Sequence, residues 1–366
     1  MNDADAVLRL AADLVAIDSR SSVSNLAVAE RIEAELTGFD VVRVDYADAN
    51  GLAKRALVAH RGPRGGIALS GHMDTVPDTG WTDPWTPRVT NGVLHGLGSV
   101  DMKGPVAACI IAARGLPESV PATLLITTDE ETSKQGARAV AASDAARALG
   151  LRGIVVAEPT GLLPVRGHRS HIEYTAVSNG VQAHSSTGQG VNANWALIPF
   201  LAEMKAVFER LRHDPAFHDA GYDPPFSDFN LIVDNHGTAV NVTAAKATAR
   251  IKFRRSRNVD YAPIEAEVRE AAARAGVTLT EKREGTPPEL PADHPLVALA
   301  VRETGAPART APYGTDASEL QDLAPCIVLG PGTIATAHTP HECVAVADLV
   351  AAVPLFRRML AATPAA

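Results

Sequence analysis

The chain has 366 residues, and at about 150 residues per domain this length predicts roughly two domains. With 46% hydrophobic and 21% charged residues, the composition excludes a disordered or fibrous protein and predicts a sizeable core. The formal net charge of -8 provides no basic field for phosphates or anionic lipids. Nucleic-acid and membrane partners are therefore not expected.

The three cysteines are far apart and form no CxxC pair, which favours a reducing compartment over a disulfide framework. No apolar run approaches the ~18–20 residues that a membrane helix needs. The beginning of the chain is acidic, where a signal peptide would be basic. We therefore expect a cytoplasmic protein.

Helical and strand-like apolar patterns alternate along the first part of the chain. Helices are predicted at 6–17, 26–36, 105–116 and 137–149, and short strands at 56–59, 66–70, 122–127 and 153–157. This alternation predicts an α/β fold, with a mixed or mostly parallel sheet flanked by helices.

The pattern changes after about Val165 and returns near the end of the chain. The middle part predicts strands at 172–180, 229–233 and 248–253 and helices at 192–212 and 262–275. The last part predicts helices at 295–304 and 347–360 and a buried strand at 326–330. The simplest interpretation is an α/β domain that is interrupted by a separate α+β domain.

Acidic and imidazole side chains follow the predicted strands at the points where those strands end. They are His72, Asp74, Asp101, Glu130, Glu131, Glu158 and His338. Ligands bind outside the carboxyl ends of strands in open α/β sheets, so one crevice could gather all seven side chains.

The motif GHMDTVP places His72 and Asp74 two residues apart, on one face of an extended segment. We interpret His72 as a metal ligand and Asp74 as the carboxylate that orients its ring. Alone, this motif is equally typical of a solvated turn. Asp101 in GLGSVDMKG suits a carboxylate that bridges two cations, although a DxKG loop alone is more often a surface turn.

Glu130 and Glu131 are adjacent, so both can serve one site only if the strand ends there. The following Thr132, Ser133 and Gly136 permit such a turn. One carboxylate could then bind a metal while the other acts as a general base. Without that context, two consecutive glutamates are usually solvated surface residues.

Glu158 ends an apolar run and precedes a proline that keeps it extended. His338 follows an apolar stretch, where a lone histidine is more often a core residue, and His341 is a competing candidate. Together, two histidines and three carboxylates supply the ligands of a dinuclear zinc or cobalt centre with a spare base. The sequence has no cysteine zinc set, Walker loop, GxSxG or GxGxxG motif to compete.

Six ordered segments, spread over nearly the whole chain, resemble one enzyme family. They are SGHMDTVP, GLGSVDMKG, TTDEETSKQGA, AEPTGLLPVRGH, AHSSTGQGVNA and VLGPGTIATAHTPHE. The family is that of the dinuclear zinc amidohydrolases and metallopeptidases, which includes acetylornithine deacetylase, succinyl-diaminopimelate desuccinylase, aminoacylases and glutamate carboxypeptidases. Within it, the segments are most similar to those of acetylornithine deacetylases.

The resemblance implies a zinc-exopeptidase-like catalytic domain made of residues 1–168 and 285–366. It also implies that residues 169–284 form an inserted ferredoxin-like lid that mediates homodimerisation. Two divalent metal ions are implied, most often zinc, with cobalt or manganese as alternatives. Three positions depart from the family pattern and leave the substrate open: Ser170, His341 and Asp316.

The resemblance assigns roles to individual residues. The implied metal ligands are His72, Asp101, Glu131, Glu158 and His338, with Asp101 bridging the ions and followed by a cis peptide. The implied catalytic residues are the general base Glu130, the His72 partner Asp74, and His184, which in relatives reaches the site of the partner subunit. The implied substrate-binding residues are Asn241, Arg254, Thr315 and Asp316.

The implied reaction is hydrolysis of the amide bond of an N-acyl amino acid, in the first place N-acetyl-ornithine to ornithine and acetate in arginine biosynthesis. Alternatives with the same centre are a succinyl-diaminopimelate desuccinylase, a broad N-acyl-amino-acid amidohydrolase, and a metallo-carboxypeptidase or dipeptidase. An alternative of a different class is a non-catalytic binding protein on the same fold. That alternative predicts lost metal ligands, and none is missing here.

Overall fold

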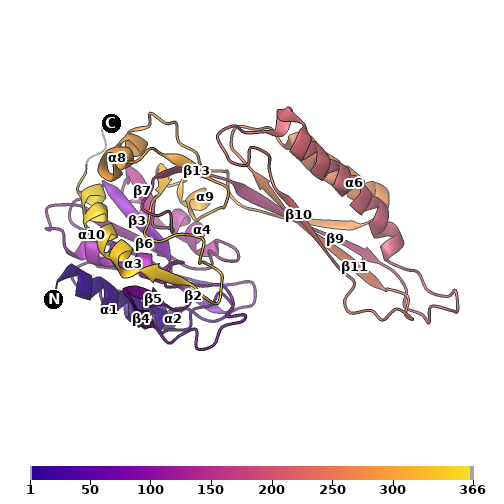
Figure 1. Ribbon diagram of the computed structural model, residues 1–366, viewed down its shortest axis with the longest axis horizontal. Helices are drawn as coiled ribbons and strands as arrows, with labels where there is room; N and C mark the ends of the chain where they lie inside the picture. Colours follow the sequence, from indigo (N-terminus) through magenta and orange to yellow (C-terminus); the bar gives the residue numbers. More distant parts are fainter. Residues whose placement is uncertain (1, 363–366) are drawn as a thin grey trace. The chain divides into compact units, whose positions relative to one another are not determined.

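The computed structural model describes residues 2–362 and divides the chain into two units (Figure 1). Within the described residues, unit 1 combines the chain up to Gly167 with Pro288–Thr310 and the chain from Thr315 onward. Unit 2 combines His168–Pro287 with Ala311–Gly314. In this part of the chain, no helix has the length and apolar character that crossing a bilayer requires.

A mixed sheet of eight strands forms the centre of unit 1, as the alternating pattern predicted. Its four inner strands β6, β3, β7 and β14 are parallel neighbours, whereas β1 and β2 are antiparallel. In spatial order the strands are β1 (Asp40–Ala47), β2 (Ala53–Arg61), β6 (Ala122–Thr127), β3 (Ile67–His72), β7 (Gly153–Val156), β14 (Cys326–Val328), β8 (Val165–His168) and β13 (Arg309–Ala311).

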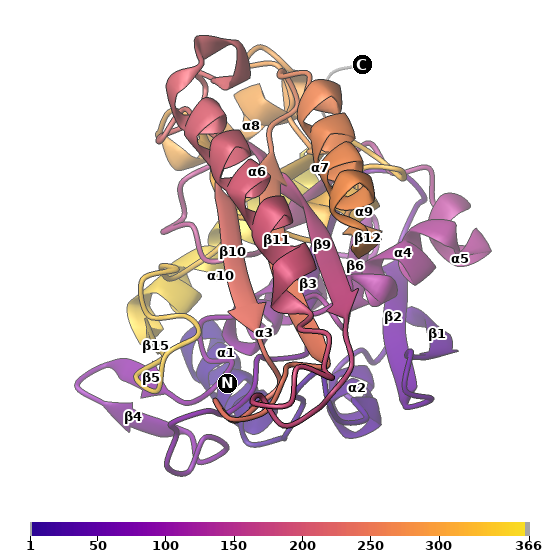
Figure 2. The same ribbon diagram turned by 90° about the vertical axis from the view of Figure 1, so that its right-hand side faces the viewer.

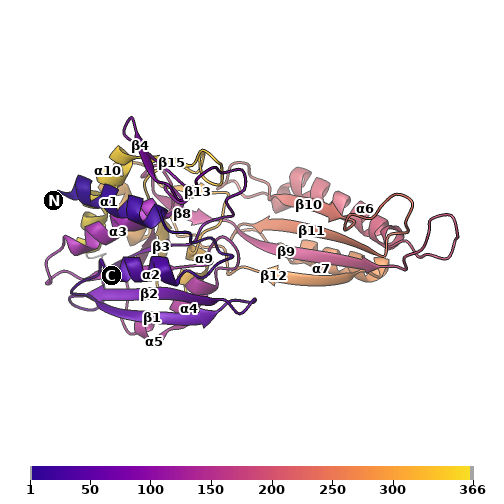
Figure 3. The ribbon, with the colours of Figure 1, turned by 90° about the horizontal axis from the view of Figure 1, so that it is seen from below.

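Helices cover both faces of this sheet (Figures 1 and 3). One group shares a single hydrophobic core with β3 and β6: α1 (Asp3–Val15), α2 (Leu26–Glu33), α3 (Lys103–Arg114), α8 (Pro295–Thr304) and α10 (Val346–Ala361). The other group is α4 (Gln135–Ala142), which contacts β2 and β6, with α5 (Asp144–Arg147) and α9 (Ala317–Leu320) beside it. A small sheet has the order β15 (Cys343–Ala345), β5 (Val93–His95) and β4 (Arg88–Thr90).

The single helix predicted at 137–149 is in fact two helices, α4 and α5. Ser143 between them has an extended backbone, with ψ of 139°. Its hydroxyl oxygen accepts a hydrogen bond from the backbone N–H of Ala146 at 3.2 Å and so begins the second helix. The apolar period alone does not reveal this break.

Unit 2 is a four-stranded antiparallel sheet with two helices packed on one face (Figure 2). The chain order is β9 (Ser170–Asn179), α6 (Asn194–His213), β10 (Phe229–Asp234), β11 (Lys246–Arg255), α7 (Ala262–Ala275) and β12 (Thr278–Arg283), with a short 3-10 helix at Pro215–Phe217. The spatial order is β10, β11, β9, β12. This β-α-β-β-α-β arrangement is that of the ferredoxin-like fold.

The four parallel strands bring their carboxyl ends to one edge of the sheet, where two backbone segments come very close together. A Cβ on Gly330, just after β14, would lie 2.1 Å from the carbonyl oxygen of Ala157, just after β7. Gly330 also accepts backbone hydrogen bonds from Thr160 and Leu162. The approach therefore depends on the absence of a side chain at Gly330.

We predict that Gly330→Ala lowers the free energy of unfolding by about 1–3 kcal/mol, because the facing backbone has little freedom to move. Thermal unfolding followed by circular dichroism measures the change. Gly153→Ala is the matched control, since the atoms nearest to its Cβ would belong to the flexible Leu296 side chain, at 3.0 Å, and not to the backbone. Equal midpoints for wild type and Gly330→Ala would contradict this account.

Candidate metal centre

Five of the acidic and imidazole side chains predicted at strand ends gather into two groups that share Asp101. His72, Asp101 and Glu158 form the first ligand set, and Asp101, Glu131 and His338 form the second. Within each set the donor atoms all lie within 4.8 Å of one another. All five are metal-binding residue types, so the arrangement provides two neighbouring cation sites with Asp101 between them.

His72 is the last residue of β3 and is buried. Its Nε2 lies 3.1 Å from Asp101 Oδ1 and 3.7 Å from Glu158 Oε1. Its Nδ1 donates a hydrogen bond to the backbone oxygen of Asp74 at 3.0 Å, with the Asp74 carboxylate 3.4 Å away. With Nδ1 donating to this oxygen, Nε2 is the ring nitrogen that faces the ligand set, and it can bind a cation once it has lost its proton.

Asp101 is held in place by its own backbone. The N–H groups of Val100 and Asp101 both donate to Glu342 Oε1 at 3.0 Å. The peptide from Asp101 to Met102 is cis, as the resemblance implies. His338 completes the second set, with Nε2 3.2 Å from Asp101 Oδ2 and 3.0 Å from Glu131 Oε1. The competing candidate His341 is exposed and belongs to neither set.

Glu130 and Glu131 lie in a turn that begins directly after β6. Their backbone N–H groups donate to the two carboxylate oxygens of Asp74 at 3.2 and 3.3 Å. The strand therefore ends before this pair, as the sequence required, and the two side chains are not forced to opposite faces of a strand. Glu131 is a member of the second set, whereas Glu130 belongs to neither and lies 3.4 Å from the ammonium of Lys134.

The protonation of the metal-free site reflects crowding of acidic groups away from water. Burial, with the charge of Asp101 added, raises the pKa of Glu131 to about 8 and that of Glu158 well above its ordinary value. Burial opposes the charged form of His72, but hydrogen bonds to Asp101 and Asp74 outweigh it and raise its pKa. Hydrogen bonds to Asp101 and Glu131 raise the pKa of His338 to about 11. Two divalent cations would neutralise this crowd, so the residues fit a dinuclear centre.

His184 and Asn241 lie next to each other in unit 2. The N–H of Ser185 donates to the Asn241 backbone oxygen at 3.0 Å, and both predicted side chains are exposed. Nδ1 of His184 accepts the backbone N–H of Ser186 at 3.3 Å, so the neutral ring carries its proton on Nε2. Arg254 lies on β11 of the same unit and is half-buried.

Thr315 and Asp316 are buried in unit 1. Asp316 Oδ2 accepts a hydrogen bond from the hydroxyl of Thr127 at 2.5 Å, and the backbone oxygen of Thr315 accepts one from Lys134 at 2.8 Å. Burial, with the charge of Glu130, raises the pKa of Asp316 to about 8. The structure thus connects both residues to the surroundings of Glu130.

Sequence reasoning missed several residues that hold the site residues in place, either directly or through one further residue. They are Ser21, Tyr46, Lys54, Asp129, Lys134 and Glu342. One signal was present, because Lys54 is a charged residue within a strand that is otherwise mostly buried. The others are polar residues in loops or on an edge strand, where polar residues are ordinary.

We predict that metal binding near pH 7 releases protons and strengthens as the pH rises. The protons held by Glu131 and His338 in the metal-free protein must leave before these side chains can bind a cation. Calorimetric titration of the chelator-treated protein with zinc, in buffers of different ionisation enthalpy, measures the number released. A heat of binding that is independent of the buffer would contradict the prediction.

Comparison with known proteins places this centre in a family. Residues 68–362 match the model described as "Peptidase family M20/M25/M40". The chain is 33% identical over 344 residues to the acetylornithine deacetylase of Proteus mirabilis (strain HI4320), which covers 89% of this chain and 87% of that protein. It is also 33% identical over 296 residues to the acetylornithine deacetylase of Erwinia tasmaniensis, covering 76% of this chain and 75% of that protein.

Solved structures share the fold at lower identity. The di-peptidase Dug1p from Saccharomyces cerevisiae superposes with a TM-score of 0.77 at 16% identity, over 98% of this chain and 96% of that chain. Aminopeptidase PepT from Bacillus cereus ATCC 10987 superposes with a TM-score of 0.72 at 20% identity, over 98% of both chains. From the extent of the family match and the identity to these deacetylases, the chain belongs to peptidase family M20/M25/M40.

Proposed function

We propose that this protein hydrolyses the amide bond of an N-acyl amino acid, with N-acetyl-ornithine as the substrate and ornithine and acetate as the products. The observation that carries the proposal is the position of Glu130, a carboxylate that belongs to neither ligand set but lies in the same turn as Glu131. The identity to two acetylornithine deacetylases supports this choice of substrate. The same relatives support a place in arginine biosynthesis, and the free cysteines support the cytoplasm.

The two ligand sets would hold two divalent ions, zinc or alternatively cobalt or manganese. When bound, such ions supply Lewis acidity, which polarises a carbonyl group and lowers the pKa of water. Asp74 holds the His72 ring through its backbone oxygen and the Glu130–Glu131 turn through its carboxylate. Asp74 therefore keeps a ligand and the general base in a fixed relation to each other.

Glu130 is the proton carrier of the reaction. Burial raises the pKa of its carboxyl group, and the charge of Lys134 acts in the opposite direction. A raised pKa lies closer to pH 7, and a group with such a pKa can both take up and return a proton at that pH. Glu130 takes a proton from the water that attacks the acyl carbonyl and then gives it to the departing amine.

Residues of unit 2 complete the proposal. His184 donates a hydrogen bond from Nε2 to the carbonyl oxygen as negative charge develops on it, with Asn241 beside it. The guanidinium of Arg254 binds the substrate α-carboxylate. We place His184 in the site of the partner subunit, and Thr315 and Asp316 at the amino-acid side chain of the substrate.

Release of free amine from a small substrate panel tests the function. The panel consists of N-acetyl-ornithine, N-acetyl-methionine, N-succinyl-diaminopimelate and a glutamyl dipeptide, each offered to the zinc-loaded and the chelated protein. We expect the zinc-loaded protein to prefer N-acetyl-ornithine and the chelated protein to be inactive. Preference for another member would refute this substrate, and no turnover of any member would refute the proposed hydrolase activity.

The variant Glu130→Ala separates the base from the ligands. It should keep both metal ions, because Glu130 belongs to neither ligand set, and lose about 100- to 10,000-fold in kcat. Metal content by atomic absorption and amine release are measured on the same sample. Wild-type turnover with full metal content would remove Glu130 from its role.

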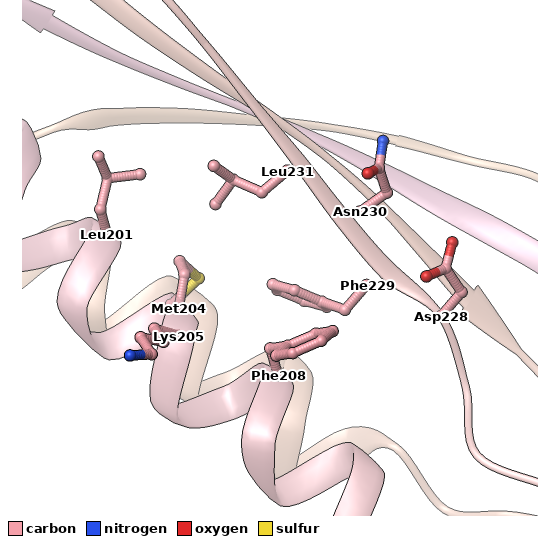
Figure 4. A pocket seen from close by; sticks show the side chains of 8 residues that line it. All are labelled: Leu201, Met204, Lys205, Phe208, Asp228, Phe229, Asn230 and Leu231. Carbon is pink, nitrogen blue, oxygen red and sulfur yellow. The ribbon is translucent and has the colours of Figure 1, made fainter.

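We also propose that unit 2 mediates a homodimer. Its helix α6 and edge strand β10 expose large apolar side chains, with Trp195 71% and Ile232 53% exposed. Between the two elements lies a groove of about 370 Å³, lined by Leu201, Met204, Lys205, Phe208, Asp228, Phe229, Asn230 and Leu231 (Figure 4). An open apolar strand edge beside an apolar helix suits pairing with a second copy.

The variant Ile232→Lys should convert the dimer to a monomer, because a lysine on an edge strand opposes strand pairing. Light scattering after size-exclusion chromatography measures the mass. Val42→Lys is the matched control, since Val42 is an exposed valine on β1, an edge strand of the eight-stranded sheet in unit 1. A dimer that survives Ile232→Lys would rule out this edge as the interface.

A further inference from the structure

Lys54 and Asp129 form a buried ion pair, and neither residue belongs to a ligand set. Lys54 on β2 is fully buried, and its ammonium Nζ lies 2.9 Å from Asp129 Oδ1. The same Nζ donates to the backbone oxygens of Ser21 and Val23, each at 2.8 Å. The ammonium is thus fixed by two backbone hydrogen bonds, and its charge faces the Asp129 carboxylate.

Asp129 is the residue at which the catalytic turn begins. Its Oδ2 accepts a hydrogen bond from the hydroxyl of Tyr46 at 2.8 Å, while its Oδ1 faces the Lys54 ammonium in the ion pair. Its backbone has a left-handed φ of 62°, and its carbonyl accepts the N–H groups of Ser133 and Lys134 at 2.9 and 2.6 Å. The turn that carries Glu130 and Glu131 is therefore fixed at its first residue.

Lys54 is also connected to the Glu130–Glu131 turn through Ser21 and Asp74. Ser21, whose backbone oxygen Lys54 holds, donates from its hydroxyl to Asp74 Oδ2 at 2.7 Å. Asp74 in turn accepts the N–H groups of Glu130 and Glu131 and holds the His72 ring. One ammonium thus connects the two segments that position the ligands and the base.

We propose that Lys54 and Asp129 are positioning residues of the metal centre, and that Asp129 acts selectively on the second ligand set through Glu131. This inference rests on the proposed function in that it takes two metal ions to be bound. Asp129 does not position the first set, because His72 and Glu158 are carried by β3 and the segment after β7 rather than by the turn. Loss of Lys54 affects both sets, because it also removes the hydrogen bond to Ser21. Ser21 holds Asp74, and Asp74 holds the His72 ring of the first set.

The test measures cobalt binding to the chelator-treated, full-length protein by absorption spectroscopy and chelator competition. Glu131→Ala and Glu158→Ala first identify the spectrum that belongs to each set. Asp129→Asn should then lower the affinity of the Glu131 set for cobalt by about 10- to 100-fold, because loss of a group that orients a ligand has an effect of this size. The ion of the Glu158 set should keep its wild-type affinity.

Lys54→Met should lower the affinity for cobalt at both ligand sets. If this variant does not fold, two further variants still test the inference. Tyr46→Phe removes only the hydroxyl that holds Asp129 and should weaken the same ion as Asp129→Asn, by a smaller factor. Arg31→Met is the matched control, because it breaks ion pairs to Asp13 and Glu35 that do not reach the centre. It should leave both affinities unchanged.

Two results would overturn the inference while leaving the proposed function standing. One is wild-type affinity for both ions in Asp129→Asn and Tyr46→Phe. The other is an equal loss in Arg31→Met, which would mean a general loss of stability rather than positioning. A wild-type protein that takes up no second ion would instead overturn both this inference and the dinuclear centre.

Discussion

Acidic side chains with restricted access to water lie together at the carboxyl edge of the parallel strands, and much of the site follows from this crowding. Glu130, Glu131 and Glu158 surround Asp101, and burial disfavours their charged forms. Such a group is stable only when protons or cations compensate it. The same crowding that disfavours the charged carboxylates in the metal-free protein favours the binding of two divalent ions.

The surrounding residues determine where each carboxylate of the site lies. Asp74 holds the backbone of the glutamate turn and the ring of His72, while Glu342 holds the backbone of Asp101. Glu131 is thereby aligned with Asp101 and His338, whereas its neighbour Glu130 stays outside both sets and faces Lys134. Two chemically identical side chains thus have different surroundings, which fits the different roles proposed for them.

Much of the fold could be predicted from the period of the apolar residues. The helices at 262–275 and 295–304 and the strand at 122–127 are confirmed with the predicted bounds. The strands β1 and β12 were missed because they are sheet edges, mostly exposed and rich in charged residues, and carry no clear apolar alternation. Their place is determined by hydrogen bonds to β2 and β9 rather than by their own sequence.

For the site, the sequence by itself determined the residue types and placed His72, Glu130, Glu131 and Glu158 just after predicted strands, whereas Asp101 and His338 lie in longer loops. Short motifs are local features and gave seven candidates, and the resemblance selected His72, Asp101, Glu131, Glu158 and His338 from them, the five side chains that the structure brings together. The sharing of Asp101 by two sets was expected as well, whereas only the tertiary structure decided that Lys54 reaches Asp129 and that Glu342 holds the backbone of Asp101. These contacts join residues that are far apart in the chain, and their distances depend on how the strands are ordered in the sheet, which no local pattern records.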